Sequence, residues 1–598
     1  MEDKVENSSD QREMGSQEIP RRQQGGLITI PFIIANEAFE KIASYGLVSN
    51  MILYLIKNYH MSVAKGTSVI FIWTAATSFM PLLGAFLSDS YLGRFLTIGF
   101  GSITSLLGIV LLWLTAMVPE SKPPPCIPSS QTCRSPTAAQ LTHLFSSLAL
   151  ISIGAGGVRP CSIAFGADQL ERRDNSKHQG ILESFFGWYY ASSFLAVLIA
   201  LTGIVYLQDH IGWKVGFGVP AVLMFVATIV FFIASPLYLK KKPKKSLFTG
   251  LVQVIVVSYR NRNLSFPSTN SREHYHHNED SKIVVPSDKL RFLNKACIIR
   301  NPEQDIGPDG LAVDPWRLCT IEQVEELKAL IKVLPVWSTG IMLSITASQS
   351  SFMLLQASSM NRHISQRFQI PAASFATFGL IIMVIWVILY DRVILPLASK
   401  IKGKPVQLSV KLRMGIGLFL SWMAMVVSAI IESIRRGKAI QEGYLNNASA
   451  VLDMSAMWLV PQYCLLGLAE AFTAIGQTEF FYTELPKSLS SIAASLFGLG
   501  MAVANLLSTV VVSTVNDLTS RGGKESWVSS NINKGHYNYY YWLLAVMSFI
   551  NLLYFLLCSW AYGPCGEQVT KVRDTGNDSK KEEALPNLVG IRLKEDEK

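Results

Sequence analysis

The stretch LITIPFIIANEAFEKIASYGLVSNMILYLI, residues 27–56, decides how the rest of the sequence is interpreted. It is longer than the roughly 20 apolar residues that cross a bilayer as a helix, yet Glu37, Glu40 and Lys41 lie near its middle. Each ionised side chain at the centre of a lipid-facing helix costs about 2.5–3.5 kcal/mol, so three would cost roughly 8–10 kcal/mol. Their i, i+3, i+4 spacing places all three on one helix face. We therefore predict that this face borders a wet cavity or carries paired or protonatable groups, as in a proton or ion pathway.

The composition indicates a membrane protein with several spans. Of the 598 residues, 49% are hydrophobic and 16% are charged, whereas soluble domains have about 25% charged residues. The apolar residues form long blocks that recur along the whole chain. The net charge of +10 does not indicate nucleic-acid binding, because the basic residues cluster beside the blocks, as the positive-inside rule requires.

The apolar blocks predict about twelve transmembrane helices. They fall at roughly 27–56, 67–88, 95–117, 141–165, 181–206, 215–239, 327–355, 371–397, 410–434, 455–482, 489–514 and 538–562. Six precede and six follow a long polar stretch. This arrangement is typical of an all-α membrane protein with two pseudo-symmetric six-helix bundles and a site between them. A twelve-span channel or membrane-bound enzyme is the alternative, but no GxxxxGK[ST], H-E-x-x-H or G-x-S-x-G motif is present.

The polar stretch sets the predicted topology. The segments are a cytosolic N-terminal tail (1–25), a six-helix bundle (26–239), a cytosolic linker (240–325), a second six-helix bundle (326–562) and a cytosolic C-terminal tail (563–598). The linker opens with a lysine run at 240–245, which favours the cytosol, and contains a short amphipathic segment at 246–259 that we expect along the membrane surface. One loop disagrees with this topology, because Arg435, Arg436 and Lys438 would be external.

Two features fit an external location. Cys126 and Cys133 lie in a Pro/Ser-rich loop and form either a disulfide or two free thiols. Asn447 begins an Asn-Ala-Ser glycosylation acceptor.

No metal site or cofactor is expected. Three linker histidines resemble a metal cluster on paper, but in a polar loop we expect solvated side chains; they are His274, His276 and His277.

The first candidate site is the acidic cluster with its expected partner. Two close carboxylates in a low-dielectric site do not easily both ionise, and Lys41 holds one of them charged. Such a cluster can take up and release a proton, whereas the alternative is a structural ion pair. Arg159, in ISIGAGGVRPCSIAF of the fourth span, needs an acidic partner, for which Glu37 or Glu40 is the candidate, unless it snorkels to water. Glycines in the same motif would let a neighbouring helix approach closely; they are Gly154, Gly156 and Gly157.

Further candidates lie elsewhere in the chain. Glu470, a lone carboxylate in the tenth span, is expected to bind substrate or form a gate ion pair, or else to be a hydrogen-bonded structural residue. In GAFLSDSYLGR, residues 84–94, Asp89 and Arg94 can bridge helices at a gating turn, and Thr97 has the spacing of a kinase site. Residues that could line a cavity, or could merely pack, are Trp73, Tyr189, Tyr190, Trp337, Gln349, Gln477 and Tyr482.

The motifs together resemble the plant nitrate/peptide transporter family, a branch of the proton-coupled oligopeptide transporters of the major facilitator superfamily. The resemblance spans about 25–565 and rests on Glu37-Ala-Phe-Glu40-Lys41, GAFLSDSYLGR, GAGGVRP, LPVWSTGIM, PQYCLLGLAEA and EFFYTELPKS. It implies the major facilitator fold and proton symport by alternating access. The first motif would then be the proton-coupling motif, Arg159 would occupy a position where many relatives have a lysine that pairs with it, and Glu470 would act in substrate binding or gating. Thr97 also matches a position that can be a regulatory phosphosite in some relatives, which makes a cytosolic kinase a candidate partner; the alternative is an accidental match.

Two departures from the family's patterns bear on the substrate. Peptide-carrying relatives follow the first motif with F-x-Y-Y, whereas this chain has Ile42-Ala43-Ser44-Tyr45, which argues against di- and tripeptides. Some nitrate carriers have a histidine two residues before a glutamine in the seventh span, but here Ala347 precedes Gln349. Nitrate cannot bind through that imidazole.

The charges nevertheless favour an anion. With the carboxylates protonated, Lys41 and Arg159 leave the cavity net positive. We therefore expect a proton-coupled symporter of nitrate or a similar small anionic solute, which is not an enzyme, is driven by the proton gradient and resides in the plasma membrane. Alternatives are a phytohormone such as gibberellin or abscisic acid, a glucosinolate or a di/tripeptide, the vacuolar membrane and, more remotely, a passive anion channel or nutrient sensor. The oligomeric state is not predicted.

Overall fold

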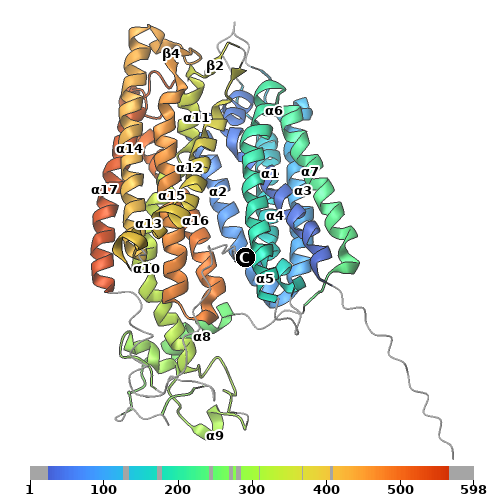
Figure 1. Ribbon diagram of the computed structural model, residues 1–598, viewed down its shortest axis with the longest axis vertical. Coiled ribbons are helices and arrows are strands. Elements are labelled where there is room, and N and C mark those ends of the chain that lie inside the picture. The colour runs from blue at the N-terminus through green and yellow to red at the C-terminus, as the bar shows by residue number, and fades with distance from the viewer. Residues whose placement is uncertain are drawn as a thin grey trace, which may run out of the picture.

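The computed structural model describes residues 25–125, 134–170, 178–241, 247–267, 274–277, 285–308, 310–366, 368–403 and 408–563. Cys126 and Cys133, and most of the two predicted tails, lie outside these residues. The described chain is almost entirely helical, with four short strands at one end of the molecule (Figure 1).

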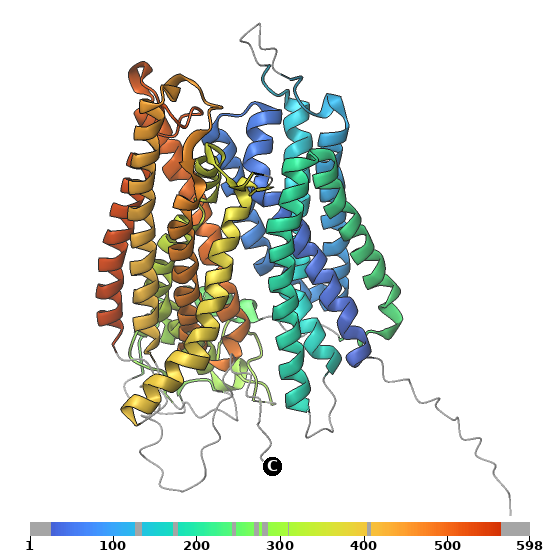
Figure 2. The ribbon, with the colours of Figure 1, turned by 45° about the horizontal axis from the view of Figure 1, so that its top comes forward.

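The helices form two groups that lie side by side (Figures 1 and 2). The N-terminal half contains α1 (Ile30–Tyr59), α2 (Val63–Leu87), α3 (Arg94–Met117), α4 (Ala138–Leu170), α5 (His178–Ile199), α6 (Val205–His210) and α7 (Trp213–Ile233). The C-terminal half contains α10 (Ile321–Ala347), α11 (Ser350–Ser358), α12 (Ala376–Leu389), α13 (Leu395–Lys402), α14 (Val410–Gln441), α15 (Val460–Glu484), α16 (Ser490–Thr519) and α17 (Tyr537–Tyr562).

Two helices and four strands mark the ends of the molecule. The helices α8 (Leu247–Arg260) and α9 (Pro302–Asp305) lie below the C-terminal half in Figure 1, and we refer to this end as the linker end. At the opposite, distal end, β1 (Met360–Asn361) runs parallel to β4 (Leu452–Ser455). There too, β2 (His363–Ser365) pairs antiparallel with β3 (Phe368–Gln369).

Eleven of the described helical segments are long and apolar enough to cross a membrane. The twelfth crossing unit is α1, which has 30 residues but is more polar because it carries Glu37, Glu40 and Lys41. The predicted all-α membrane fold is confirmed. Several crossing units contain an irregular turn, and three of these turns are π-helical: Ser88–Leu92 after α2, Ala200–Ile204 between α5 and α6, and Tyr390–Ile394 between α12 and α13.

The two halves repeat one packing pattern. In the N-terminal half α4 packs against α2 and α3, while α7 packs against α1 and α3. In the C-terminal half α15 packs against α12 and α14, while α17 packs against α10 and α14. The main contact between the halves runs along α2 and α16. This internal repeat places α1 and α4 of one half, and α10 and α15 of the other, in corresponding positions.

Glycines set the closest helix crossings, as the GAGGVRP motif predicted. A Cβ atom built on Gly84 of α2 would lie 1.9 Å from the carbonyl oxygen of Gly156 on α4. One built on Gly157 would lie 2.7 Å from the carbonyl oxygen of Thr97 on α3. The C-terminal half repeats this device, since a Cβ on Gly467 of α15 would lie 2.2 Å from the carbonyl oxygen of α12 Gly379. These backbones touch, and no larger residue fits between them.

One of the basic residues at the distal end of α14, Arg435, is explained by burial. Arg435 is fully buried and forms two bonds with Glu432, with Nε–Oε2 and Nη2–Oε1 distances of 2.7 Å each. Its Nη1 donates to Oδ1 of Asn533 at 2.8 Å, next to α17. Arg435 is therefore an internal charge that Glu432 neutralises. The external loop with Arg435, Arg436 and Lys438 thus conflicts less with the positive-inside rule than the sequence suggested.

The described parts of the linker pack more extensively than the polar composition of the linker predicted. The apolar face of α8, with Leu251, Val254 and Val257 buried, packs against the linker end of α10 and shares one core with it. The expectation that all three linker histidines are solvated is wrong for His276. His276 is buried, and its backbone N–H donates to the carbonyl oxygen of Cys297 at 2.9 Å. Burial is the main cause that lowers the pKa of its imidazole below the usual value, and the neighbouring His277 lowers it further.

We predict that Gly84→Val destabilises the N-terminal half. The added side chain would clash with the backbone of α4, which cannot move aside as a side chain can. The loss of stability should therefore reach or exceed the about 1–3 kcal/mol of ordinary overpacking. Thermal unfolding in detergent measures it. The control is Gly437→Val on α14, where an added Cβ meets nothing within 4 Å. Equal unfolding temperatures for the two variants would contradict the crossing geometry.

We also predict that Arg435→Leu lowers stability by about 3–5 kcal/mol, because it leaves the Glu432 carboxylate buried without its partner. The double variant Arg435→Leu/Glu432→Leu should recover much of this loss. Thermal unfolding again provides the measurement, with the exposed Arg521→Leu as control. A double variant that is less stable than the single one would show that the buried pair itself, rather than the orphaned charge, dominates.

Candidate functional site

The α1 cluster is built around an ion pair between Glu40 and Arg159 of α4. The pair is bidentate, with Nε–Oε2 and Nη2–Oε1 distances of 3.1 Å each. Ser44, one turn along α1, donates its hydroxyl to Oε1 of Glu40 at 2.5 Å. The guanidinium also lies 5.9 Å from the ring of Tyr45. Because Glu40 is fully buried, these bonds compensate the loss of its hydration.

The second pair in the cluster is Glu37 with Lys41. The ammonium Nζ lies 3.3 Å from Oε1 of Glu37, donates to Oγ of Ser193 on α5 at 2.8 Å, and sits 5.6 Å from the ring of Tyr189. Glu37 is 2% exposed. Its other oxygen, Oε2, forms no hydrogen bond with any of the described residues. A buried carboxylate oxygen without a donor is the place in this cluster where a proton can attach without displacing another bond.

Two features hold α5 against α1 so that Ser193 reaches Lys41. The π-helical turn Ala200–Ile204 packs on α1 beside Gly46, where an added Cβ would lie 2.7 Å from the side chain of Ile204. One turn further on, Gln208 donates its amide to the carbonyl oxygen of Gly46 at 3.0 Å. Sequence reasoning missed Ser44 and Ser193. Ser44 could have been found from its i+4 spacing to Glu40, whereas nothing in the sequence pairs Ser193 with Lys41.

Glu470 lies apart from this cluster. Its side chain on α15 is exposed, and it makes no hydrogen bond or ion pair with the described part of the chain. The structure therefore offers it as a free carboxylate of the C-terminal half and does not join it to Lys41 or Arg159.

Tyr190 on α5 and Tyr482 on α15 come from opposite halves and lie near each other. Tyr190 is 62% exposed and Tyr482 is 45% exposed, and the two hydroxyls lie within range of electrostatic interaction. They are the predicted cavity residues that the structure brings together from opposite halves. Trp73 and Tyr189, by contrast, are buried within the N-terminal half.

Trp337 and Gln477 hold the helices of the C-terminal half together. The indole Nε1 of Trp337 donates to the carbonyl oxygen of Leu496 at 2.8 Å, which ties α10 to α16. Gln477 is 5% exposed, and its amide occupies the space beside Gly340 of α10, where an added Cβ would lie 1.7 Å from Nε2. Both residues are therefore in the helix contacts that border the site.

Gln349 does not join the other candidates. It is fully buried at the break between α10 and α11. Its Nε2 donates to the carbonyl oxygen of Ile345 at 2.7 Å, and its Oε1 accepts from the hydroxyl of Tyr540 at 2.9 Å. With both ends of its amide bonded inside the C-terminal half, the side chain has no group to offer a substrate.

The gating turn at the linker end is joined by more partners than the sequence suggested. Arg94 lies 3.7 Å from Oδ1 of Asp89 but only 2.5 Å from Oδ2 of Asp168 at the end of α4. Lys241 donates to the other oxygen of Asp168 at 2.9 Å. In the C-terminal half Arg413 and Glu479 form a corresponding pair at 2.6 Å.

The two predicted modification sites differ in access. Thr97 is 5% exposed and its hydroxyl donates to the carbonyl oxygen of Gly93 at 3.0 Å. A kinase can therefore reach it only if this turn opens. Asn447 is exposed at the distal end, where its Oδ1 accepts from the backbone and hydroxyl of Ser449.

Comparison with known proteins places this geometry in a family. The family model described as PTR2: POT family matches residues 95–528. Similar curated proteins of Arabidopsis thaliana include NRT1/PTR FAMILY 1.2, 65% identical over 95% of both chains, and NRT1/PTR FAMILY 1.1, 60% identical over 97% of this chain and 100% of that one.

Solved structures show the same fold at low identity. They include an auto-inhibited POT family peptide transporter, with TM-score 0.65, 20% identity and coverage of 90% of this chain and 98% of that one. The POT family transporter PepTSo matches equally, with TM-score 0.65, 19% identity and the same coverage. The predicted major facilitator architecture is confirmed. The chain thus belongs to the POT family and, within it, to the NRT1/PTR proteins, so it is a membrane transporter and not an enzyme.

Proposed function

We propose that the protein is a proton-coupled symporter of nitrate or a similar small anionic solute. The observation that carries this proposal is the buried Glu37, which has one oxygen bound to Lys41 and the other without a hydrogen-bond partner in the described structure. Protonation of Glu37 would leave the ammonium of Lys41 without its negative partner. The same step would leave the neighbouring Glu40–Arg159 pair intact.

Charge balance then links the proton to the solute. In the described arrangement two carboxylates and two cations neutralise each other, so the cluster attracts no anion. One proton on Glu37 gives the cluster a net positive charge in a medium of low dielectric constant, where an anion gains much more than in water. An anion near Lys41 and Ser193 restores neutrality. Release of the proton on the other side of the membrane expels the anion by the same logic.

Glu470 supplies the reason to expect more than one proton per anion. Bringing an anion into a negative-inside cell costs about 2.3 kcal/mol per 100 mV. A single proton makes the cycle electroneutral, and a second proton lets the voltage drive uptake. Glu470 is an exposed carboxylate of the opposite half without a partner among the described residues, and it is the second protonatable group of this proposal.

The proposed orientation follows from the basic linker. The lysine run and the linker end face the cytosol, as do both termini, and the distal end with Asn447 faces outside. The plasma membrane is the proposed location, with the vacuolar membrane as the alternative.

Larger organic anions are the second candidate. Ala347 provides no imidazole, and Gln349 is consumed by internal bonds, so neither residue of the seventh span supports nitrate. The exposed rings of Tyr190 and Tyr482 would suit the hydrocarbon part of a carboxylate such as gibberellin or abscisic acid. A glucosinolate fits the same description.

We predict that Glu37→Gln, which mimics the protonated carboxyl, uncouples transport. Solute exchange between equal concentrations should persist, whereas uphill accumulation driven by a pH gradient should fall to the equilibrium level, because Lys41 no longer alternates between paired and unpaired states. Proteoliposomes measure both activities. Glu120→Gln, exposed in the short 3-10 turn Pro119–Ser121 beyond α3, is the control. Retained uphill accumulation in Glu37→Gln would refute the assignment.

An uptake panel in proton-clamped oocytes tests the substrate. Nitrate should give the largest pH-dependent uptake, accompanied by an inward current that grows with membrane potential. A dipeptide, gibberellin, abscisic acid and a glucosinolate form the rest of the panel. Current-free nitrate uptake would exclude the second proton, and uptake of an organic anion without nitrate would replace the proposed substrate.

A further inference from the structure

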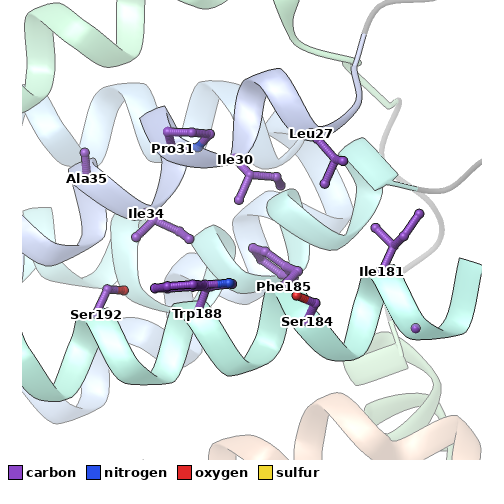
Figure 3. Close-up of a pocket in the computed structure, with 11 residues that line it drawn as sticks. Leu27, Ile30, Pro31, Ile34, Ala35, Ile181, Ser184, Phe185, Trp188 and Ser192 are labelled. Atoms are coloured by element: carbon purple, nitrogen blue, oxygen red, sulfur yellow. The ribbon is translucent and has the colours of Figure 1, made fainter. Parts of the chain in front are cut away.

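A large apolar groove separates the first part of α1 from α5 (Figure 3). It encloses about 940 Å³, within the range of about 300–1,000 Å³ typical of ligand pockets. The apolar side chains that face one another across it are Leu27, Ile30 and Ile34 from the N-terminal side and Ile181, Phe185 and Trp188 from α5. The groove is separate from the ion pairs of the α1 cluster, none of whose charged residues lines it.

The groove opens away from the C-terminal half. Trp188, one of its walls, is 71% exposed. Tyr190 lies two positions further along α5, which corresponds to about 200° of rotation around a helix, and it lies near Tyr482 of the other half. Trp188 therefore points to the opposite side of α5, toward the surroundings of the bundle. In a membrane transporter the surroundings at this depth are lipid.

The walls of the groove cannot hold water or an ion. The polar side chains among its lining residues are Ser184, Ser192 and the indole N–H of Trp188. The hydroxyl of Ser192 already donates to the carbonyl oxygen of Tyr189 at 2.9 Å. Ser184 and Ser192 are eight residues apart, which is about 12 Å along a helix. A buried water needs two to four polar partners together, and no charged side chain lines the groove.

We propose that this groove binds an acyl chain of a bilayer lipid. A chain of methylene groups is the occupant that matches apolar walls on membrane-spanning helices, because it restores the dispersion contacts that an empty groove lacks. In lipid such packing, rather than the hydrophobic effect, decides which groups associate.

The position of the groove gives the lipid a role in the transport site. Ser192 lines the groove, and the next residue, Ser193, accepts the hydrogen bond from Lys41. On α1, Ala35 lines the groove two positions before Glu37. An acyl chain in the groove would therefore pack against the outer side of the two helix segments whose inner sides hold the Glu37–Lys41 pair.

Photo-crosslinking identifies the occupant. A benzophenone amino acid at Ser184, in the groove, is compared with one at Val222 of α7, which is 59% exposed. The full-length protein is purified from membranes, exchanged into detergent, irradiated and analysed by intact mass. We expect an adduct of phospholipid mass at position 184 that survives the exchange, and its loss at position 222. Equal lipid adducts at both positions, no lipid adduct at 184, or an adduct with the chain's own N-terminal tail or another protein would overturn the proposal.

Filling the groove provides the second arm. A Cβ on Gly180, which lines the groove, meets nothing within 4 Å, so Gly180→Leu fills the space without a backbone clash. The matched control is Gly187→Leu on the same helix, where a Cβ is equally free but outside the lining. We expect Gly180→Leu to lose the lipid adduct at position 184 with an unchanged unfolding temperature, and Gly187→Leu to keep it. Retention of the adduct in Gly180→Leu would mean that the lipid lies outside the groove.

Discussion

The ion pair between Glu40 and Arg159 is the interaction on which the transport site depends. It fixes α1 to α4 through two parallel bonds, and with Arg159 committed to Glu40, Lys41 is left to serve Glu37 alone. If Arg159 were absent, Lys41 would have to serve two carboxylates, and one of them would remain a buried charge without a counter-ion. The spacing of the charged residues on α1 therefore gives one ion pair that stays intact, Glu40–Arg159, and one that protonation can break, Glu37–Lys41. A hydrogen bond from Ser44 stabilises Glu40, and a hydrogen bond to Ser193 stabilises Lys41.

The same constraint, that every charge inside the bundle must be compensated, organises the C-terminal half without making it a copy of the first. Among its buried charges, Glu432 and Arg435 pair with each other toward the distal end, and Arg413 pairs with Glu479 toward the linker end. Glu470 differs from these residues, since it is exposed and forms no hydrogen bond or ion pair with the described residues. The two halves thus share their helix packing and glycine crossings, but they differ in how their protonatable carboxylates are paired. The closely paired carboxylates lie in the N-terminal half, and Glu470 is an unpaired carboxylate of the C-terminal half.

The sequence was sufficient for features that follow from local pattern. The transmembrane spans follow from the length of the apolar blocks, and the charges of α1 share a face because of their spacing. Gly156 and Gly157 mark close helix crossings because glycine has no side chain. Features that depend on which helices become neighbours were not accessible. Two examples are the main partner of Arg94, which is Asp168, and the partner of Lys41, which is Ser193. In both cases the two residues are far apart in the sequence, and no sequence pattern links them. Burial of Arg435 and Gln349 reverses what their polarity suggests, because their partners come from α17 and the loop before it. The order of the linker was missed since the core of α8 is completed by α10.

The π-helical turns carry a mechanical consequence. Each holds one residue more than a regular α-helical turn, and one residue corresponds to about 100° of winding. If the surplus residue in Tyr390–Ile394 were released, α13 beyond it would rotate by that angle relative to α12. Asp391 belongs to this turn, and Asp89 belongs to the matching turn Ser88–Leu92 in the other half. Both halves therefore carry an acidic residue in a π-helical turn, and in the C-terminal half a discrete rotation of the helix end would change the neighbours of that turn while α12 stays in place.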